Sequence, residues 1–214
     1  MDIKQTKVVR IVNILHSVVY VVKICYNLCI YSILAPQKFL QEVFMILKWY
    51  KPDYIFEKTI NITPQFLSER NIRCIFLDAD GTLRRHKKLE AADGVMDWID
   101  LMHKNRIKLF ITSNNFKKKV RPFAQVVNLP CVTFSAKPTP WGFIRARFRT
   151  KVPLKNTLVV GDQIFTDVLG AHIAGMKAAM VLPLFHEEGK GFDMKRSFEQ
   201  QYIDLYLEEH GEFL

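Results

Sequence analysis

The sequence predicts an α/β fold: a Rossmann-like parallel sheet with helices on both faces and no lid domain, preceded by N-terminal apolar helices. From residue 74 onward, short apolar runs alternate with amphipathic segments, and such a series forms parallel strands joined by right-handed crossover helices. The run Cys74-Ile75-Phe76-Leu77 is apolar throughout, as in a strand covered on both faces. Strands are expected at 74–77, 107–112, 131–134, 157–160 and 178–182, and helices at about 93–105, 116–127, 139–149 and 166–174.

The 214 residues divide into three expected parts. Residues 1–50 form a basic and apolar helical segment, residues 51–190 form the α/β domain, and residues 191–214 form a C-terminal tail that we expect to be helical. A net charge of +10 indicates an anionic partner: phosphate esters, nucleic acid or an acidic membrane. The four cysteines form no C-x-x-C pair, which indicates reduced thiols rather than a disulfide framework.

Residues 11–35 are strongly apolar, and their few polar residues recur every three or four positions, on one face of a helix. A membrane-spanning helix would bury Lys23 near the bilayer centre, at a cost of roughly 2.5–3.5 kcal/mol. A helix lying in the interface avoids this cost, because Lys23 then reaches the headgroups. We therefore favour a membrane-associated protein with its domain on the cytoplasmic side, or on the matrix or stromal side of an organelle. A spanning helix and a soluble packing helix are the alternatives.

Two further helices are expected before the first of these strands. One covers residues 37–50, where apolar side chains recur on one side after Pro36 has ended the preceding segment. The other begins with Thr63 as its N-cap and Pro64 at its first position, and it leads into the strand at 74–77.

Two carboxylates follow that strand directly, in the order Asp78-Ala79-Asp80-Gly81-Thr82. Alternation along an extended chain places Asp78 and Asp80 on the same side, and Gly81 lets the chain turn away. Carboxylates this close repel each other unless a cation lies between them or one is protonated. The pair therefore suggests a Mg²⁺ site, with one Asp as nucleophile and the other as acid and base. The alternative is an Asp-Gly turn that closes a hairpin.

Other reactive residue types follow the later strands, namely Ser113, Lys137 and Asp162. The carboxyl ends of parallel strands meet at one edge of a sheet, so these residues should share a crevice with Asp78 and Asp80. The set suits phosphoryl transfer. Asp78 would attack phosphorus, and Asp80 would protonate the leaving alkoxide and then activate water.

The remaining groups would bind phosphate and metal. Ser113 and Asn114 are the expected phosphate ligands, and the ammonium group of Lys137 would place a positive charge next to the phosphoryl oxygens. Mg²⁺ prefers oxygen ligands and keeps several waters, so a few protein oxygens are enough. The expected metal-binding residues are Asp78, Asp80, Asp162 and Asp167.

Four ordered motifs now resemble those of the haloacid-dehalogenase superfamily: Asp78-x-Asp80-Gly81-Thr82, Ser113, Lys137-Pro138 and the stretch 161–167. The second Asp of the first motif is what the resemblance associates with phosphatases. More narrowly, the stretches 51–64, 112–115 and 161–170 are similar to the subclass IIIA phosphatidylglycerophosphate phosphatase family. The similarity covers roughly residues 45–184 and implies that lipid as substrate. Ala79-Asp80-Gly81 departs from the Leu-Asp-Asn of this family.

The spacing of the motifs predicts an open site. Only 32 residues separate Asp80 from Ser113, and 23 separate Ser113 from Lys137, so one helix and one strand use up each interval. A site without a lid accepts a large or membrane-anchored substrate but loses the water exclusion that a lid provides. Basic clusters at 84–88 and 117–121 are expected to rim the crevice and attract an anionic headgroup. A third cluster at 145–151 fits an ordinary solvated helix end equally well.

We therefore expect a Mg²⁺-dependent phosphomonoesterase that forms an aspartyl phosphate and converts phosphatidylglycerophosphate to phosphatidylglycerol at a membrane surface. One alternative is a phosphatase of soluble sugar or nucleotide phosphates, and another is a non-catalytic membrane-bound scaffold. Nucleic acid is not expected as a partner, because aromatic residues do not interleave with the basic clusters. The oligomeric state is left open.

Overall fold

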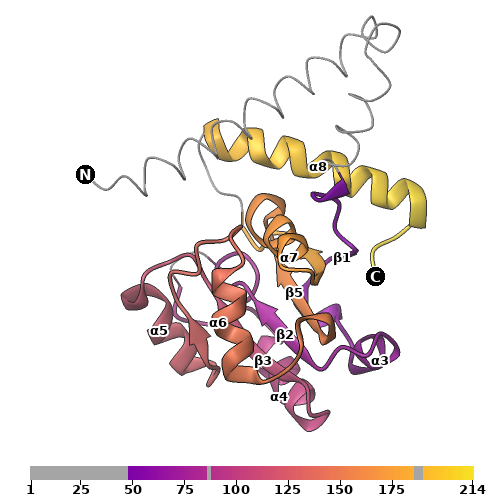
Figure 1. Cartoon of the computed structure of the whole chain (residues 1–214). Coiled ribbons are helices and arrows are strands. Elements are labelled where there is room, and N and C mark those ends of the chain that lie inside the picture. Colours follow the sequence, from indigo (N-terminus) through magenta and orange to yellow (C-terminus); the bar gives the residue numbers. More distant parts are fainter. Residues whose placement is uncertain (1–47, 86–87, 186–189) are drawn as a thin grey trace, which may run out of the picture. The chain divides into compact units, whose positions relative to one another are not determined.

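A six-stranded parallel sheet forms the centre of the domain in the computed structural model, which describes residues 48–85, 88–185 and 190–214 (Figure 1). Neighbouring strands follow the order β1-β6-β5-β2-β3-β4, and each adjacent pair is parallel. The prediction of a Rossmann-like α/β sheet is confirmed. The strands are β1 (Tyr54–Phe56), β2 (Cys74–Leu77), β3 (Lys108–Thr112), β4 (Cys131–Val132), β5 (Thr157–Gly161) and β6 (Lys177–Val181).

Helices connect the strands and cover both faces of the sheet. Thr63 caps the first of them as expected, because its side-chain oxygen accepts a hydrogen bond from the Phe66 N–H at 3.1 Å. The α-helices are α3 (Pro64–Glu69), α4 (Val95–Lys104), α5 (Lys117–Val126), α6 (Trp141–Thr150), α7 (Leu169–Ile173) and α8 (Lys190–His210). Shorter turns of helix are η2 (Thr59–Asn61), η3 (Leu154–Asn156) and the π-helix η4 (Ile164–Val168).

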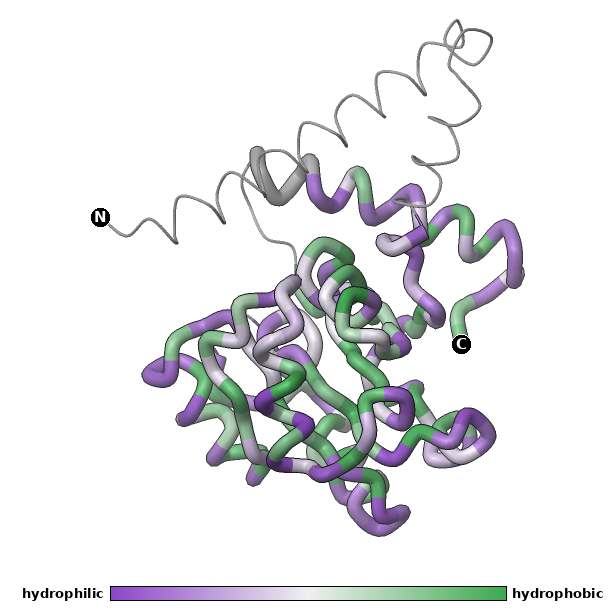
Figure 2. The backbone as a smooth tube through the Cα atoms, in the orientation of Figure 1, coloured by the Kyte–Doolittle hydropathy of each residue, from purple (hydrophilic) through white to green (hydrophobic). Residues whose placement is uncertain are grey.

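Strand β2 lies between two hydrophobic cores, and all four of its side chains are fully buried. Ile75 and Leu77 pack into one core with residues of α3, α4 and α5, whereas Cys74 and Phe76 pack into the other with residues of α6, α7 and α8. Phe76 also stacks on Phe143 of α6, with the ring centroids 6.1 Å apart. Figure 2 shows the hydrophobic strands at the centre and hydrophilic stretches at the periphery. The apolar run is thus a strand covered on both faces.

Three elements differ from the expectation. Strand β1 was missed, because a strand of three residues between Asp53 and Glu57 is too short to show alternation. Strand β4 has two residues instead of four, since the chain turns into a left-handed conformation at Phe134, with φ of 51°. The helix expected at 166–174 begins earlier, as the π-turn η4, and continues as α7 up to a left-handed Gly175.

The apolar helix expected at 11–35 lies outside the described residues, and so do residues 37–47 of the helix expected at 37–50. Of the last three residues of that helix, Lys48 is helical and the chain turns at Trp49 and Tyr50. Within the described residues, no helix is long and apolar enough to cross a membrane. In the described part of the chain, α4 and β3 occupy the interval from Asp80 to Ser113, and α5 and β4 occupy the interval from Ser113 to Lys137. Neither interval holds a further domain among the described residues.

Candidate active site

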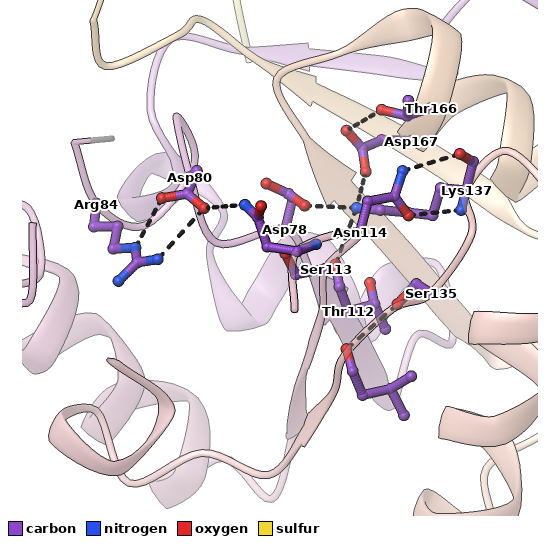
Figure 3. Close-up of polar contacts among 12 residues, drawn as sticks. Asp78, Asp80, Arg84, Thr112, Ser113, Asn114, Ser135, Lys137, Thr166 and Asp167 are labelled. Atoms are coloured by element: carbon purple, nitrogen blue, oxygen red, sulfur yellow. Dashed lines mark hydrogen bonds and ion pairs between the residues drawn. The ribbon is translucent and has the colours of Figure 1, made fainter. Parts of the chain in front are cut away.

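Lys137 lies at the centre of a buried ion cluster beyond the carboxyl ends of β2 and β3 (Figure 3). Its ammonium group donates to Asp78 Oδ1 at 2.6 Å, to Asp167 Oδ1 at 2.5 Å and to the main-chain oxygen of Thr112 at 2.9 Å. These three acceptors match the three N–H donors of a lysine. Burial acts to lower the pKa of Lys137, but the carboxylates of Asp167 and Asp78 outweigh it and raise that pKa. Lys137 is therefore charged at neutral pH.

Asp78 is the most accessible member of this cluster. Its side chain is 14% exposed, whereas those of Lys137 and Asp167 are 2% and 3% exposed. Burial raises the pKa of Asp78 to about 6, with Lys137 opposing this shift and Asp167 adding to it. Asp78 is thus mostly ionised at neutral pH, which is the form that a nucleophile needs.

The Asp80 carboxylate is held by a separate set of donors on the other side of Asp78 (Figure 3). Arg84 donates from Nε to Oδ1 at 2.9 Å and from Nη2 to Oδ2 at 3.4 Å, and Asn115 Nδ2 donates to Oδ2 at 3.0 Å. Arg84 is only 2% exposed, and its guanidinium lies over the Phe123 ring at 4.5 Å. The expectation that Arg84 belongs to an exposed basic rim is therefore wrong; its buried charge orients Asp80.

The hairpin alternative for the Asp-Gly sequence is also wrong, because β2 ends at Leu77 between the parallel strands β3 and β5. Beyond the end of the strand, alternation no longer governs the direction of the side chains. Asp78 therefore contacts Lys137, whereas Asp80 contacts Arg84.

Asp162 follows β5 and lies against the main chain of Gly81. A Cβ atom at Gly81 would lie 2.5 Å from Asp162 Oδ2, and the φ of 86° at this position also favours glycine. Burial and the nearby charge of Asp78 raise the pKa of Asp162 well above its usual range. Within the described structure, its buried Oδ1 atom has no hydrogen-bond partner.

Helix α8 reaches this carboxylate from the C-terminal end of the chain. Arg196 donates from Nη2 to Asp162 Oδ2 and from Nη1 to the Asp162 main-chain oxygen, both at 2.7 Å. The same Nη1 atom donates to Glu199 Oε2 at 2.7 Å, and Glu199 Oε1 accepts the Ile164 N–H at 2.9 Å. Glu199 is 1% exposed. These bonds, which we call the α8 clamp, hold the loop from Asp162 to Ile164 at both ends.

The loop after β3 supports Lys137 and Asp80. The Asn114 side chain donates from Nδ2 to the Lys137 main-chain oxygen at 2.9 Å, and its Oδ1 accepts the Lys137 N–H at 2.7 Å. Ser113 is buried, and its Oγ accepts the Asn115 N–H at 3.2 Å. The side chain of Asn114 therefore positions Lys137, and its second Nδ2–H is the donor that this arrangement leaves for a phosphate oxygen.

Comparison with known proteins decides the family. The model of the haloacid dehalogenase-like hydrolases matches residues 47–175. The chain belongs to this family. A probable phosphatase of Bacillus subtilis, YqeG, is 30% identical over 159 residues, which cover 74% of this chain and 92% of YqeG.

Solved structures resemble this hydrolase at lower identity. A 4-nitrophenylphosphatase from Thermotoga maritima has a TM-score of 0.47 and 14% identity, over 59% of this chain and 91% of that one. A hydrolase from Streptococcus pneumoniae has a TM-score of 0.44 and 13% identity, over 60% of this chain and 99% of that one. The family and its curated relative confirm the expectation of a phosphatase, so the scaffold alternative is not supported.

The residues of the hydrolase fit a Mg²⁺ ion, although no group of three or more His, Cys, Asp or Glu side chains within the described ranges is arranged to hold a metal by itself. Lys137 bridges two of the expected ligands, Asp78 and Asp167. Mg²⁺ needs few protein oxygens, because it keeps several waters. The partnerless buried oxygen of Asp162, next to the charge of Asp78, is the kind of atom that a cation stabilises.

Sequence reasoning missed the residues that hold the reactive groups. Arg84 appeared to be one member of a basic run, although its position four residues after Asp80 was a usable signal. Nothing in the local sequence links Arg196 or Glu199 to Asp162, since Arg196 lies 34 positions after Asp162. Only the fold of the chain brings these groups together.

Proposed function

We propose that this hydrolase is a Mg²⁺-dependent phosphomonoesterase that forms an aspartyl phosphate on Asp78. The observation that carries the proposal is the cluster of Asp78 and Lys137 beside a buried Asp162 oxygen that lacks a partner. Because Lys137 binds Oδ1 of Asp78, the other oxygen, Oδ2, would attack phosphorus. Lys137 would also attract the phosphoryl oxygens while it keeps Asp78 in place.

Asp80 would move the proton in both halves of the reaction. In the first half, the bond from Asp78 Oδ2 to phosphorus forms and the bond to the leaving oxygen breaks, as Asp80 donates its proton to that oxygen. In the second half, Asp80 takes a proton from water, whose oxygen attacks phosphorus and releases inorganic phosphate from Asp78. Arg84 and Asn115 fix the orientation of Asp80 for these two transfers.

The charge of the site would be balanced by a metal. The carboxylates of Asp78 and Asp162 and the main-chain oxygen of Asp80 would hold Mg²⁺, and Asp167 would act next to them by restraining Lys137. When bound, Mg²⁺ supplies positive charge that lets an anionic nucleophile approach an anionic phosphate. Ser113 Oγ and the main-chain N–H groups of this loop would bind the phosphate oxygens.

For the substrate, we propose phosphatidylglycerophosphate, converted to phosphatidylglycerol at the surface of an anionic membrane. The similarity of three stretches to the subclass IIIA phosphatidylglycerophosphate phosphatases supports this choice. The short connections after β2 and β3 support it too, because an open site suits a phosphate that is fixed in a bilayer. The protein would then lie on the cytoplasmic side of the membrane, or on the matrix or stromal side of an organelle.

The decisive assay measures phosphate release from phosphatidylglycerophosphate in mixed micelles and from a panel of soluble sugar and nucleotide phosphates, with Mg²⁺ and with EDTA. We expect the lipid to have the highest kcat/KM and EDTA to stop turnover. Asp78→Asn is the matched control, because it keeps the size of the side chain but removes the nucleophile. A clear preference for the soluble panel would overturn the lipid assignment, and turnover by Asp78→Asn would overturn the mechanism.

A further inference from the structure

Two exposed phenylalanines stack on each other next to the active site. The side chains of Phe116 and Phe134 are 66% and 61% exposed, and their ring centroids are 5.9 Å apart with an interplanar angle of 21°. Two large apolar side chains that meet at the surface form a patch, which single exposed residues do not. We call this pair the aromatic tip.

The backbone of the aromatic tip has an energetically unfavourable conformation at Phe134. Phe134 has a φ of 51°, a left-handed conformation that is unfavourable for a bulky residue. Arg145 fixes it by donating to the Phe134 main-chain oxygen at 2.6 Å. Because the Phe134 ring remains mostly exposed, its packing within the domain does not offset the free energy of this backbone conformation. A contact with something outside the domain would explain it.

The tip is connected directly to the catalytic groups. The Phe134 N–H donates to the Asn115 main-chain oxygen at 3.0 Å, and the Asn115 side chain binds Asp80. Phe134 lies three residues before Lys137, and Phe116 follows the loop of Asn115. A surface that touches the tip therefore lies close to the residues that hold Asp80 and Lys137.

The stretch of sequence that contains the tip is strongly basic. Between Asp100 and Asp162 the sequence contains thirteen Lys and Arg residues and no acidic residue. Lys117, Lys118 and Lys119 follow Phe116 directly and are all exposed. Exposed rings flanked by lysines match the interface of an anionic bilayer, where the rings enter the boundary of the acyl chains and the ammonium groups meet the headgroups.

We propose that the aromatic tip and Lys117–Lys119 form the surface by which the catalytic domain docks on an anionic lipid bilayer. A second copy of this chain fits less well, because its basic surface would meet another basic surface. Single-stranded nucleic acid is the competing occupant, because exposed rings beside lysines can also stack on bases, and an oligothymidylate is therefore included in the test. The inference deepens the proposed function, since docking at the tip would bring a lipid phosphate to Asp78.

A local probe tests the contact in the full chain. Phe116→Trp and, as its control, Phe148→Trp are mixed with vesicles of phosphatidylglycerol and brominated phosphatidylcholine. Phe148 is a fair control, because it is 70% exposed and lies near the end of α6, away from the strand ends that carry the site. We expect the fluorescence added at position 116 to be quenched by bromine and that at position 148 to be unaffected. Equal quenching, or none, at both positions would overturn the proposal.

The double variant Phe116→Ser/Phe134→Ser measures the strength of the contact. We expect its affinity for phosphatidylglycerol vesicles to fall roughly tenfold or more, because two partly inserted rings are lost. Phe148→Ser should bind as the wild type does, and all three proteins should share one Tm, since the side chains are exposed. Unchanged vesicle affinity, or tip-dependent binding to an oligothymidylate but not to vesicles, would refute the docking surface.

Turnover of phosphatidylglycerophosphate is measured separately, so that the two proposals can fail independently. Docking without turnover would refute the proposed substrate, and turnover without docking would refute this inference alone.

Discussion

Replacing Arg196 by methionine should destabilise the protein strongly, because it removes the cation of the α8 clamp. Asp162 and Glu199 are each 1% exposed, and both accept hydrogen bonds from Arg196 at 2.7 Å. Breaking a buried ion pair by removing one partner costs about 3–5 kcal/mol, because the remaining charge is left uncompensated. The Arg196 side chain is itself 14% exposed, which favours the lower end of this range.

The assay is urea unfolding of the full chain at pH 7.5 in EDTA. A loss of about 3 kcal/mol should also lower Tm by roughly 6–12 °C for a chain of this size. Arg147→Met is the matched control, because it removes the same charge from an exposed position on α6 and should change the free energy of unfolding by less than about 0.5 kcal/mol. We expect added Mg²⁺ to recover part of the loss at Arg196, since a cation beside Asp162 replaces part of the missing charge. A loss below about 1 kcal/mol in EDTA would show that α8 does not hold this loop.

Three further predictions concern other parts of the domain. Gly81→Ala should lose about 2–4 kcal/mol of stability by urea unfolding, because its Cβ would meet a carboxylate oxygen at 2.5 Å and its φ is 86°; a neutral result would contradict the close approach. Asn114→Leu should lower kcat by roughly 10- to 100-fold and change KM less, since the active-site lysine loses two main-chain restraints; an effect on KM alone would indicate direct substrate binding. Burial acts to lower the pKa of His172, but its bond to Asp53 at 2.9 Å outweighs this and raises that pKa. The protonated pair thus stabilises the fold below pH 6.5, and this contribution is lost as the pH rises through the raised pKa; the free energy of unfolding between pH 5.5 and 9 should therefore fall more steeply in wild type than in His172→Gln.

Local sequence patterns were sufficient to predict the strands and helices whose own residues show a clear apolar run or a capping motif. Four apolar residues in a row predicted β2, which is indeed buried on both faces, and Thr63 with Pro64 predicted the start of α3. The expected reactive residues Asp78, Lys137 and Asp162 follow strands of one parallel sheet, so the topology alone brings them to the same edge. Strand β1 could not be predicted, because three residues are too few to show a periodic pattern. Its position in the sheet comes from its pairing with β6.

The residues that follow the strands were sufficient to predict a phosphatase, because a parallel α/β sheet collects these residues at one edge. The partners that hold each of these residues became visible only in the folded chain. The tertiary structure buried Arg84 against Asp80, bonded the Asn114 side chain to the main chain of Lys137, and brought Arg196 of α8 to Asp162. The physical reason is that a strand fixes where its own end lies, whereas the partners of a buried charge come from any part of the chain that the packing brings close.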